Sequence, residues 1–169
     1  GSALGTRMVL DLVPGWTSSF PSMLTSAFGQ LFFIARDGTE AALWRSDGTP
    51  KGTQRVSPPG VLFNATQAIY PGPTFLYLCN VQSADDWGLW RSDGTTKGTL
   101  PVAPVNCLQP SWYPEHQGAM LSSGELLFAG TEAAGGTELW RSDGTGVGTF
   151  RVADLVPGPD NSTPLNFAR

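Results

Sequence analysis

The chain has 169 residues, of which 40% are hydrophobic and 14% are charged, and its formal net charge at pH 7 is −4. Six Trp and nine Phe supply more apolar surface than a disordered chain carries. The 21 Gly and 14 Pro follow no triplet period, which excludes collagen and favours a β protein rich in turns. The ten basic residues are scattered, so we expect no nucleic-acid partner. No apolar run approaches the ~20 residues of a membrane helix, so we expect no membrane insertion.

The string Trp-Arg-Ser-Asp-Gly-Thr occurs three times, at residues 44–49, 90–95 and 140–145. A Gly-Thr pair follows each copy, and a short apolar segment follows the pair. The string Asp-Leu-Val-Pro-Gly occurs near the start of the sequence, at 11–15, and again near its end, at 154–158. These repeats predict tandem copies of one small structural unit.

We therefore expect residues 1–169 to form a single repeat-built domain, or a fragment of a longer array. The expected units are 5–51, 52–97 and 98–147, with a partial repeat at 148–169.

Each unit contains four short apolar runs separated by Gly, Pro, Asp and Ser clusters, which predicts four β-strands and no helix. The expected strands are 23–28, 31–35, 42–46 and 53–57 around the first copy of the motif, and 119–123, 126–129, 138–142 and 149–153 around the last. The continuous runs at 31–35 and 75–79 predict strands that are buried on both faces. Three units of four give twelve strands. We expect one more strand at each end, a fourth strand before the first unit and a first strand after the last, so the expected total is fourteen.

The Asp-Gly pair between the third and fourth strands predicts a tight turn, because glycine accepts a positive φ and an Asp side chain bonds nearby amides. We expect a structural role for the repeated motif residues, with each Trp packed in the core and each Arg either paired with its Asp or covering apolar surface. The motif residues are Trp44, Arg45, Asp47, Gly48, Trp90, Arg91, Asp93, Gly94, Trp140, Arg141, Asp143 and Gly144.

The motif and its surroundings resemble the bacterial ELWxxDGT repeat family, and the match is closest at residues 137–145 and 11–15. That resemblance implies a secreted or surface-attached tandem repeat whose units look like blades of a β-propeller, with no family catalytic residue to carry over. The first two units have Ala42 and Gly88 where the family pattern has Glu. This difference argues against a fixed chemical role for the Glu.

The expected fold class is all-β, built from about three and a half four-stranded, propeller-like units. Propellers typically have four to eight blades, so fourteen strands do not complete a ring. A β-trefoil, which closes with three four-stranded units, is the alternative fold.

Aromatic residues that differ between the repeats are the candidate ligand-binding residues, because structural residues should recur and ligand contacts vary. Trp16 lies in one such segment, and Trp112 and Tyr113 lie in another. Exposed aromatics of this kind suit sugar or peptide recognition. Packing between neighbouring units is the alternative role.

The sequence offers little for catalysis or metal binding. His116 is the single histidine, no catalytic motif is present, and one Asp per turn falls short of the six to eight oxygen ligands of Ca²⁺. We therefore expect no enzyme activity, no metal and no cofactor. Cys79 and Cys107 are either a local disulfide or two buried thiols.

The expected function is a non-catalytic extracellular or cell-surface repeat module, a structural or adhesive building block of a larger protein or assembly. Its expected partners are proteins, through self-association or through neighbouring repeats. The alternative is a carbohydrate-binding lectin with sites in the loops between strands, for which glycans are the partner.

Overall fold

The computed structural model describes residues 5–38, 40–63, 68–83, 86–107, 118–132, 135–164 and 166–167. These residues form twelve β-strands and no α-helix, which confirms the predicted all-β class. The strands are β1 (Ser22–Ala27), β2 (Gln30–Arg36), β3 (Ala41–Ser46), β4 (Gln54–Arg55), β5 (Ala68–Pro71), β6 (Leu76–Ser83), β7 (Asp86–Ser92), β8 (Leu100–Ala103), β9 (Gly118–Met120), β10 (Leu126–Glu132), β11 (Gly136–Ser142) and β12 (Phe150–Ala153).

Consecutive strands pair into three antiparallel sheets, β1-β2-β3-β4, β5-β6-β7-β8 and β9-β10-β11-β12. The registers of the three sheets agree, because a leucine at or next to the start of the second strand lies opposite the serine that ends the third strand in each sheet. The three pairs are Leu31 with Ser46, Leu76 with Ser92, and Leu126 with Ser142. Residues at matching places in the three sheets can therefore be compared directly.

The total of fourteen strands is wrong, since residues 5–21 and 154–164 contain no strand. A fourth strand pairs with the third strand of its own sheet, and a first strand pairs with the second. Among the described residues, neither 6–10 nor 159–164 joins one of the three sheets as a strand.

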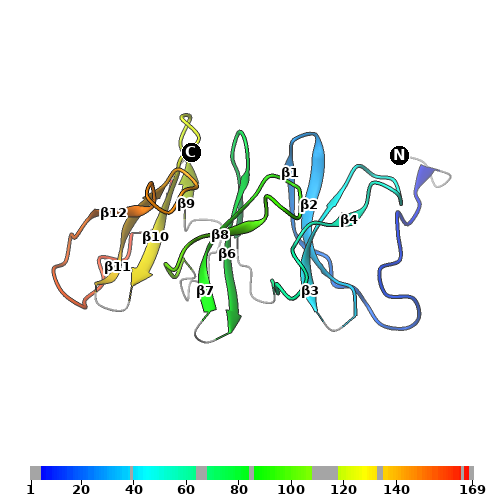
Figure 1. Cartoon of the computed structure of the whole chain (residues 1–169), viewed down its shortest axis with the longest axis horizontal. Coiled ribbons are helices and arrows are strands. Elements are labelled where there is room, and N and C mark those ends of the chain that lie inside the picture. The colour runs from blue at the N-terminus through cyan, green and yellow to red at the C-terminus, as the bar shows by residue number, and fades with distance from the viewer. Residues whose placement is uncertain are drawn as a thin grey trace.

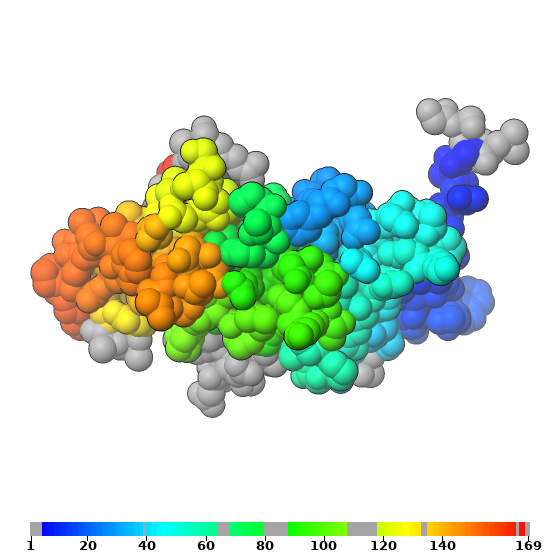
Figure 2. Space-filling model, turned by 45° about the horizontal axis from the view of Figure 1, so that its top comes forward, coloured from blue at the N-terminus to red at the C-terminus, as the bar shows by residue number. Residues whose placement is uncertain are grey.

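The three sheets stand side by side in an open row and do not close into a ring (Figure 1). Their first strands are neighbours, because β1 contacts β5 and β5 contacts β9. The space-filling view shows an elongated body with the N-terminal segment at one end and the third sheet at the other (Figure 2).

The core lies between the sheets, because side chains on each strand alternate between two faces. We call the face turned toward the preceding sheet upstream and the opposite face downstream. In β2, Phe32 and Ile34 on the downstream face pack against Leu76 and Leu78 on the upstream face of the second sheet. Burial of each such side chain contributes about 1.5–3 kcal/mol to folding, so the junctions between sheets carry much of the stability.

A second cluster fills the junction between the second and third sheets, and it includes Tyr77, Leu89, Leu126 and Phe128. The predictions of doubly buried strands at 31–35 and 75–79 are confirmed from Phe32 to Ala35 and from Leu76 to Cys79.

The structure joins Cys79 and Cys107 by a disulfide, one of the two states that the sequence left open. The bond ties β6 to the segment that follows β8, over a sequence separation of 28 residues. Both cysteines are buried in the junction between the second and third sheets.

Candidate functional site

Each Asp-Gly-Thr turn is closed by its own side chains. In the first sheet, Asp47 Oδ1 accepts a 2.9 Å hydrogen bond from the Thr49 amide and a 2.7 Å bond from the Thr49 hydroxyl. The Thr49 hydroxyl oxygen in turn accepts a 3.0 Å bond from the Gly52 amide. The same bonds recur around Asp93 and Asp143, so the repeated motif builds one identical turn three times.

The Gly-Thr pair that follows the motif completes this turn. The Ser46 and Thr53 hydroxyls lie 2.7 Å apart and are buried, and the Thr53 hydroxyl donates to the Thr49 carbonyl at 2.8 Å. A Cβ on Gly52 would overlap the Asp47 carboxylate, and the same holds at the matching glycines of the other two sheets. Only glycine fits there while the Asp47 carboxylate keeps its hydrogen bonds to Thr49.

The negative charge of each turn carboxylate is stabilised mainly by local hydrogen bonds, and the motif arginine makes a smaller contribution. The hydrogen bond from Thr49 holds the pKa of Asp47 below its ordinary value of 3.8, and the corresponding threonine does the same for the pKa of Asp93 and of Asp143. Within the described residues, no ion pair joins the Asp of a motif to its own Arg. The repeated arginines therefore make their direct contacts elsewhere.

At the second junction, the motif arginine reaches the turn of the next sheet. Arg91 Nη1 donates a 2.9 Å hydrogen bond to the Gly144 carbonyl, and the guanidinium carbon of Arg91 lies 5.2 Å from the centroid of the Phe75 ring. The Tyr77 hydroxyl donates to the Ser142 carbonyl at 3.1 Å. A Cβ on Gly144 would overlap the Phe75 ring. The turn is thus a docking point for the downstream face of the sheet before it.

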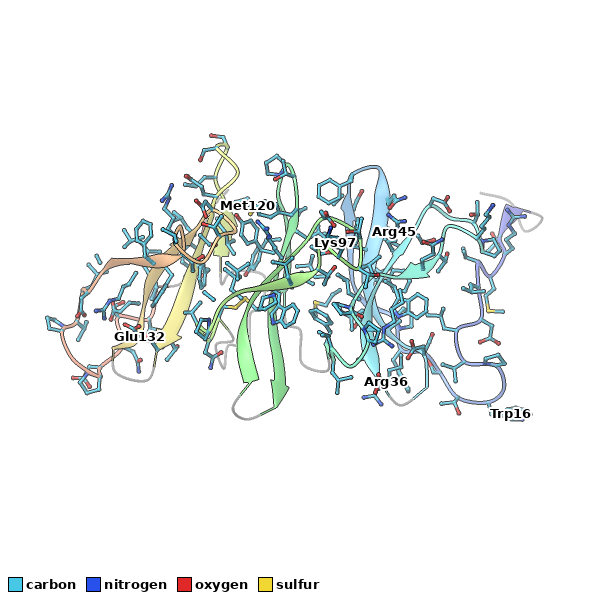
Figure 3. All side chains as sticks on the ribbon, in the orientation of Figure 1. Trp16, Arg36, Arg45, Lys97, Met120 and Glu132 are labelled. Atoms are coloured by element: carbon cyan, nitrogen blue, oxygen red, sulfur yellow. A yellow bond between two sulfur atoms is a disulfide. The ribbon has the colours of Figure 1, made fainter. Side chains whose placement is uncertain are left out.

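The first junction uses the same arginine position, but its aromatic ring is Phe32, which matches Tyr77 and not Phe75. The buried Phe32 places its Cζ atom 3.1 Å, and Arg45 its Nη1 atom 3.9 Å, from where a Cβ on Gly94 would stand. Arg45 Nη2 donates to Gln54 Oε1 at 3.4 Å. Figure 3 labels Arg45 in the first sheet and Lys97 in the facing turn of the second sheet. An aromatic ring and an arginine of one sheet therefore face the turn glycine of the next sheet at both junctions.

The third sheet carries the same arginine, and within the described residues this arginine contacts groups of its own sheet and no further turn. Arg141 pairs with Glu125, and its guanidinium carbon lies 5.4 Å from the centroid of the Phe150 ring. The hydrogen bond from Arg141 holds the pKa of Glu125 below its ordinary value. Beside this arginine, Leu127 and Leu139 are half-buried.

The three motif tryptophans lie on the upstream faces of their sheets and are buried. Trp90 packs in the first junction, with its ring centroid 5.7 Å from that of Phe63 in an edge-on arrangement. Trp140 packs in the second junction. Trp44 lies in a smaller cluster that Leu12 of the N-terminal segment covers. Their burial leaves no open ring face for a ligand.

Trp16 is the one predicted ligand-binding residue that the structure describes. Its side chain is fully exposed at 107%, and Figure 3 shows it at the tip of the N-terminal segment, away from the sheets. The other two candidates, Trp112 and Tyr113, lie outside the described residues, as does His116.

Glu138 is a buried carboxylate whose structural role the sequence patterns did not predict. It is fully buried, and its carboxylate accepts hydrogen bonds from the amides of Leu155 and Ser162, each at 3.1 Å, and from the Ser162 hydroxyl at 2.6 Å. These bonds hold the pKa of Glu138 below its ordinary value, with the Ser162 hydroxyl as the main cause. Ala42 and Gly88 occupy the matching places in the other sheets. The available signal was that Glu-Leu-Trp precedes Asp-Leu-Val-Pro-Gly only in the third repeat.

No family model, no curated protein and no solved structure matches this chain. Among the described residues there is no group of three or more His, Cys, Asp or Glu side chains that could hold a metal ion. The same residues form no helix long and apolar enough to cross a membrane. The repeated contact between a downstream face and a turn is therefore the feature on which a function can be argued.

Proposed function

We propose that this chain is a non-catalytic structural repeat module of propeller-like blades, which builds a larger extracellular or cell-surface assembly by docking sheet against sheet. One observation carries the proposal. The contact between an arginine, an aromatic ring and the turn glycine of the next sheet occurs at both junctions. A contact that repeats with the sequence is one that further repeats can extend.

The arrangement of strands supports propeller-like blades. Each unit is a four-stranded antiparallel sheet whose strands follow one another in chain order, as in the blades of a propeller. The first strands of the three sheets are neighbours, which is the place that innermost strands take around a propeller axis.

The disulfide supports an extracellular location. Disulfides persist in oxidising compartments and are rare where thiols are kept reduced, and Cys79 and Cys107 are bonded in the protein core. In a secreted module, this bond would hold the segment that leads from the second sheet to the third.

A six-sheet fusion tests the building-block function. Residues 5–153 are followed directly by residues 11–164, so that Asp11 takes the place of Asp154 and the repeat stays in phase. If sheets dock as repeats, the fusion unfolds in urea at a higher midpoint than the parent chain, because it gains a third kind of junction. The matched control carries Leu127→Glu in the first half of the fusion. Equal midpoints for the fusion, the control and the parent would contradict the proposal.

The full exposure of Trp16 favours a second candidate, carbohydrate binding on a loop aromatic. Exposed tryptophans stack on sugar rings and anchor interfaces. The test is a titration of the chain with a panel of neutral oligosaccharides, followed by tryptophan emission, with Trp16→Ala alongside. A saturable change that Trp16→Ala abolishes would support this function, and an unchanged emission across the panel would exclude it for those sugars.

A further inference from the structure

The upstream face of the first sheet is less covered than the same face of the other two. Leu31 is 36% exposed, whereas Leu76 and Leu126, at the matching places, are completely buried by the preceding sheet. Leu24 of β1 is also exposed, at 61%. The first sheet therefore presents apolar positions that its own fold buries elsewhere.

The turn of the first sheet is open in the same way. Gly94 and Gly144 are buried against the sheets before them, whereas Gly48 is exposed and a Cβ there would meet no atom within 4 Å. A hollow of about 380 Å³ lies at this turn, and Leu31 and Gly48 are among its lining residues. This hollow lies where the ring and arginine of a preceding sheet stand at the two internal junctions.

The downstream face of the third sheet shows the complementary gap. Phe32 and Tyr77 are completely buried by the next sheet, but Leu127 at the matching place is half-buried. Leu43 and Leu89 are likewise completely buried, whereas the matching leucine of the third sheet, Leu139, is half-buried. Phe150 is 43% exposed beside Arg141. This face carries the side chains that dock on a turn at the other junctions, and none of the turns that the structure describes packs on it.

We propose that a second copy of this chain docks head to tail, with the downstream face of its third sheet on the upstream face of the first sheet. Arg141 of one copy takes the role of Arg91 and donates to the Gly48 carbonyl of the other copy. Leu127 packs toward Leu31 as Tyr77 packs toward the third sheet. The occupant follows from the two internal junctions, which show that this sequence already recognises itself. The inference rests on the proposed building-block function and names a second copy of this chain as the partner.

The N-terminal segment limits the strength of this docking. Leu12 covers Trp44, and Leu155, its counterpart in the repeated Asp-Leu-Val-Pro-Gly string, is 63% exposed after the third sheet. A docked copy brings its Leu155 toward the place that Leu12 holds, so docking must displace Leu12. We therefore expect a weak, reversible association with a Kd between about 1 µM and 1 mM, in the range of small or transient interfaces.

A head-to-tail contact uses two different faces, and this property can be tested with two variants. Leu31→Glu places a carboxylate on the upstream face and Leu127→Glu places one on the downstream face. Each variant alone should stay monomeric, whereas an equal mixture should form a 1:1 dimer through the two unaltered faces. The measurement is sedimentation velocity of each variant, the mixture and the parent chain. Val147→Glu, at a 98% exposed position in the turn of the third sheet, is the matched control and should associate like the parent.

Other outcomes would overturn the inference. A parent chain that stays monomeric up to about 1 mM has no head-to-tail contact. A single variant that still dimerises would show a symmetric contact between two copies of the same face. A mixture that stays monomeric, while the parent associates, also excludes head-to-tail docking. Far-UV circular dichroism checks that the variants fold, and Leu24→Glu replaces Leu31→Glu if the latter does not.

The six-sheet fusion separates failure here from failure of the proposed function. If the fusion is stabilised and the parent stays monomeric, sheets dock within one chain and the second copy is not the partner. If the urea midpoint of the fusion does not rise above that of the parent chain either, the building-block function itself is contradicted.

Discussion

Arg91 of the second sheet donates a 2.9 Å hydrogen bond to the carbonyl oxygen of Gly144 in the turn of the third sheet. The two residues lie 53 positions apart in the sequence, but both belong to the same repeated motif. At the second junction the arginine of one copy thus binds the glycine of the next copy, and at the first junction Arg45 lies near Gly94 without this hydrogen bond. This relationship explains why Trp-Arg-Ser-Asp-Gly-Thr recurs as a whole, since the turn needs its Asp, Gly and Thr and the junction needs the Arg and the Gly.

Arg91→Ala should destabilise the fold through the second junction. The change removes a charged hydrogen-bond donor and a cation–π contact with Phe75, together worth about 1–3 kcal/mol. The measurement is the free energy of unfolding in urea, with Arg36→Ala as the control, because Arg36 is exposed at the end of β2. An exposed change of that kind stays within about 0.5 kcal/mol. Equal losses for the two variants would show that the Arg91 contact is not stabilising.

Gly144→Ala and Gly48→Ala separate the backbone of the turn from the packing of the junction. Both glycines have a positive φ, +84° and +87°, so an alanine costs about 1 kcal/mol of backbone strain at either place. Only at Gly144 does the new methyl group also overlap the Phe75 ring, which adds about 1–3 kcal/mol of overpacking. The unfolding temperature of Gly48→Ala should therefore be higher than that of Gly144→Ala. The reverse order would mean that the ring does not press on the turn.

Local patterns predicted the strands and turns well, because alternation, apolar runs and Asp-Gly pairs act over a few residues. The strand run at 31–35 and the turn at Asp47 and Gly48 are examples. Such patterns do not predict which residues the Arg91 side chain contacts, since that depends on how one sheet stacks on another. The hydrogen bonds of Glu138 were not predicted for the same reason, because its partner Ser162 lies 24 residues away.

Glu138 should make the protein sensitive to acid. Its pKa in the folded chain lies below the ordinary value of 4.5, so its stabilising effect is complete above that value and is lost as the pH falls through it toward the folded pKa. The turn aspartates, whose pKa values lie below 3.8, extend the loss to lower pH.

Urea midpoints measured from pH 7 to pH 3 should therefore fall for the parent chain and fall less for Glu138→Gln, which starts from a lower midpoint because its amide cannot accept all three hydrogen bonds. Glu132→Gln is the control, since Glu132 is 40% exposed and lies 3.6 Å from Arg151. If Glu138→Gln kept the full acid-dependent loss, the buried carboxylate would not be its source.

Removal of the Cys79–Cys107 disulfide should lower stability by about 3 kcal/mol, because a cross-link over 28 residues restricts the unfolded chain. The double variant Cys79→Ala with Cys107→Ala removes the bond and leaves two small apolar side chains in the second junction. Its unfolding midpoint in urea should match that of the parent chain measured with excess dithiothreitol, and the reductant should not shift the variant further. Thiol titration of the unfolded parent should detect no free cysteine before reduction and two afterwards. The disulfide lies between the second and third sheets and not at the open faces, so its loss should leave the head-to-tail association of folded chains intact. A double variant that folds but no longer associates would show that the disulfide also shapes those faces.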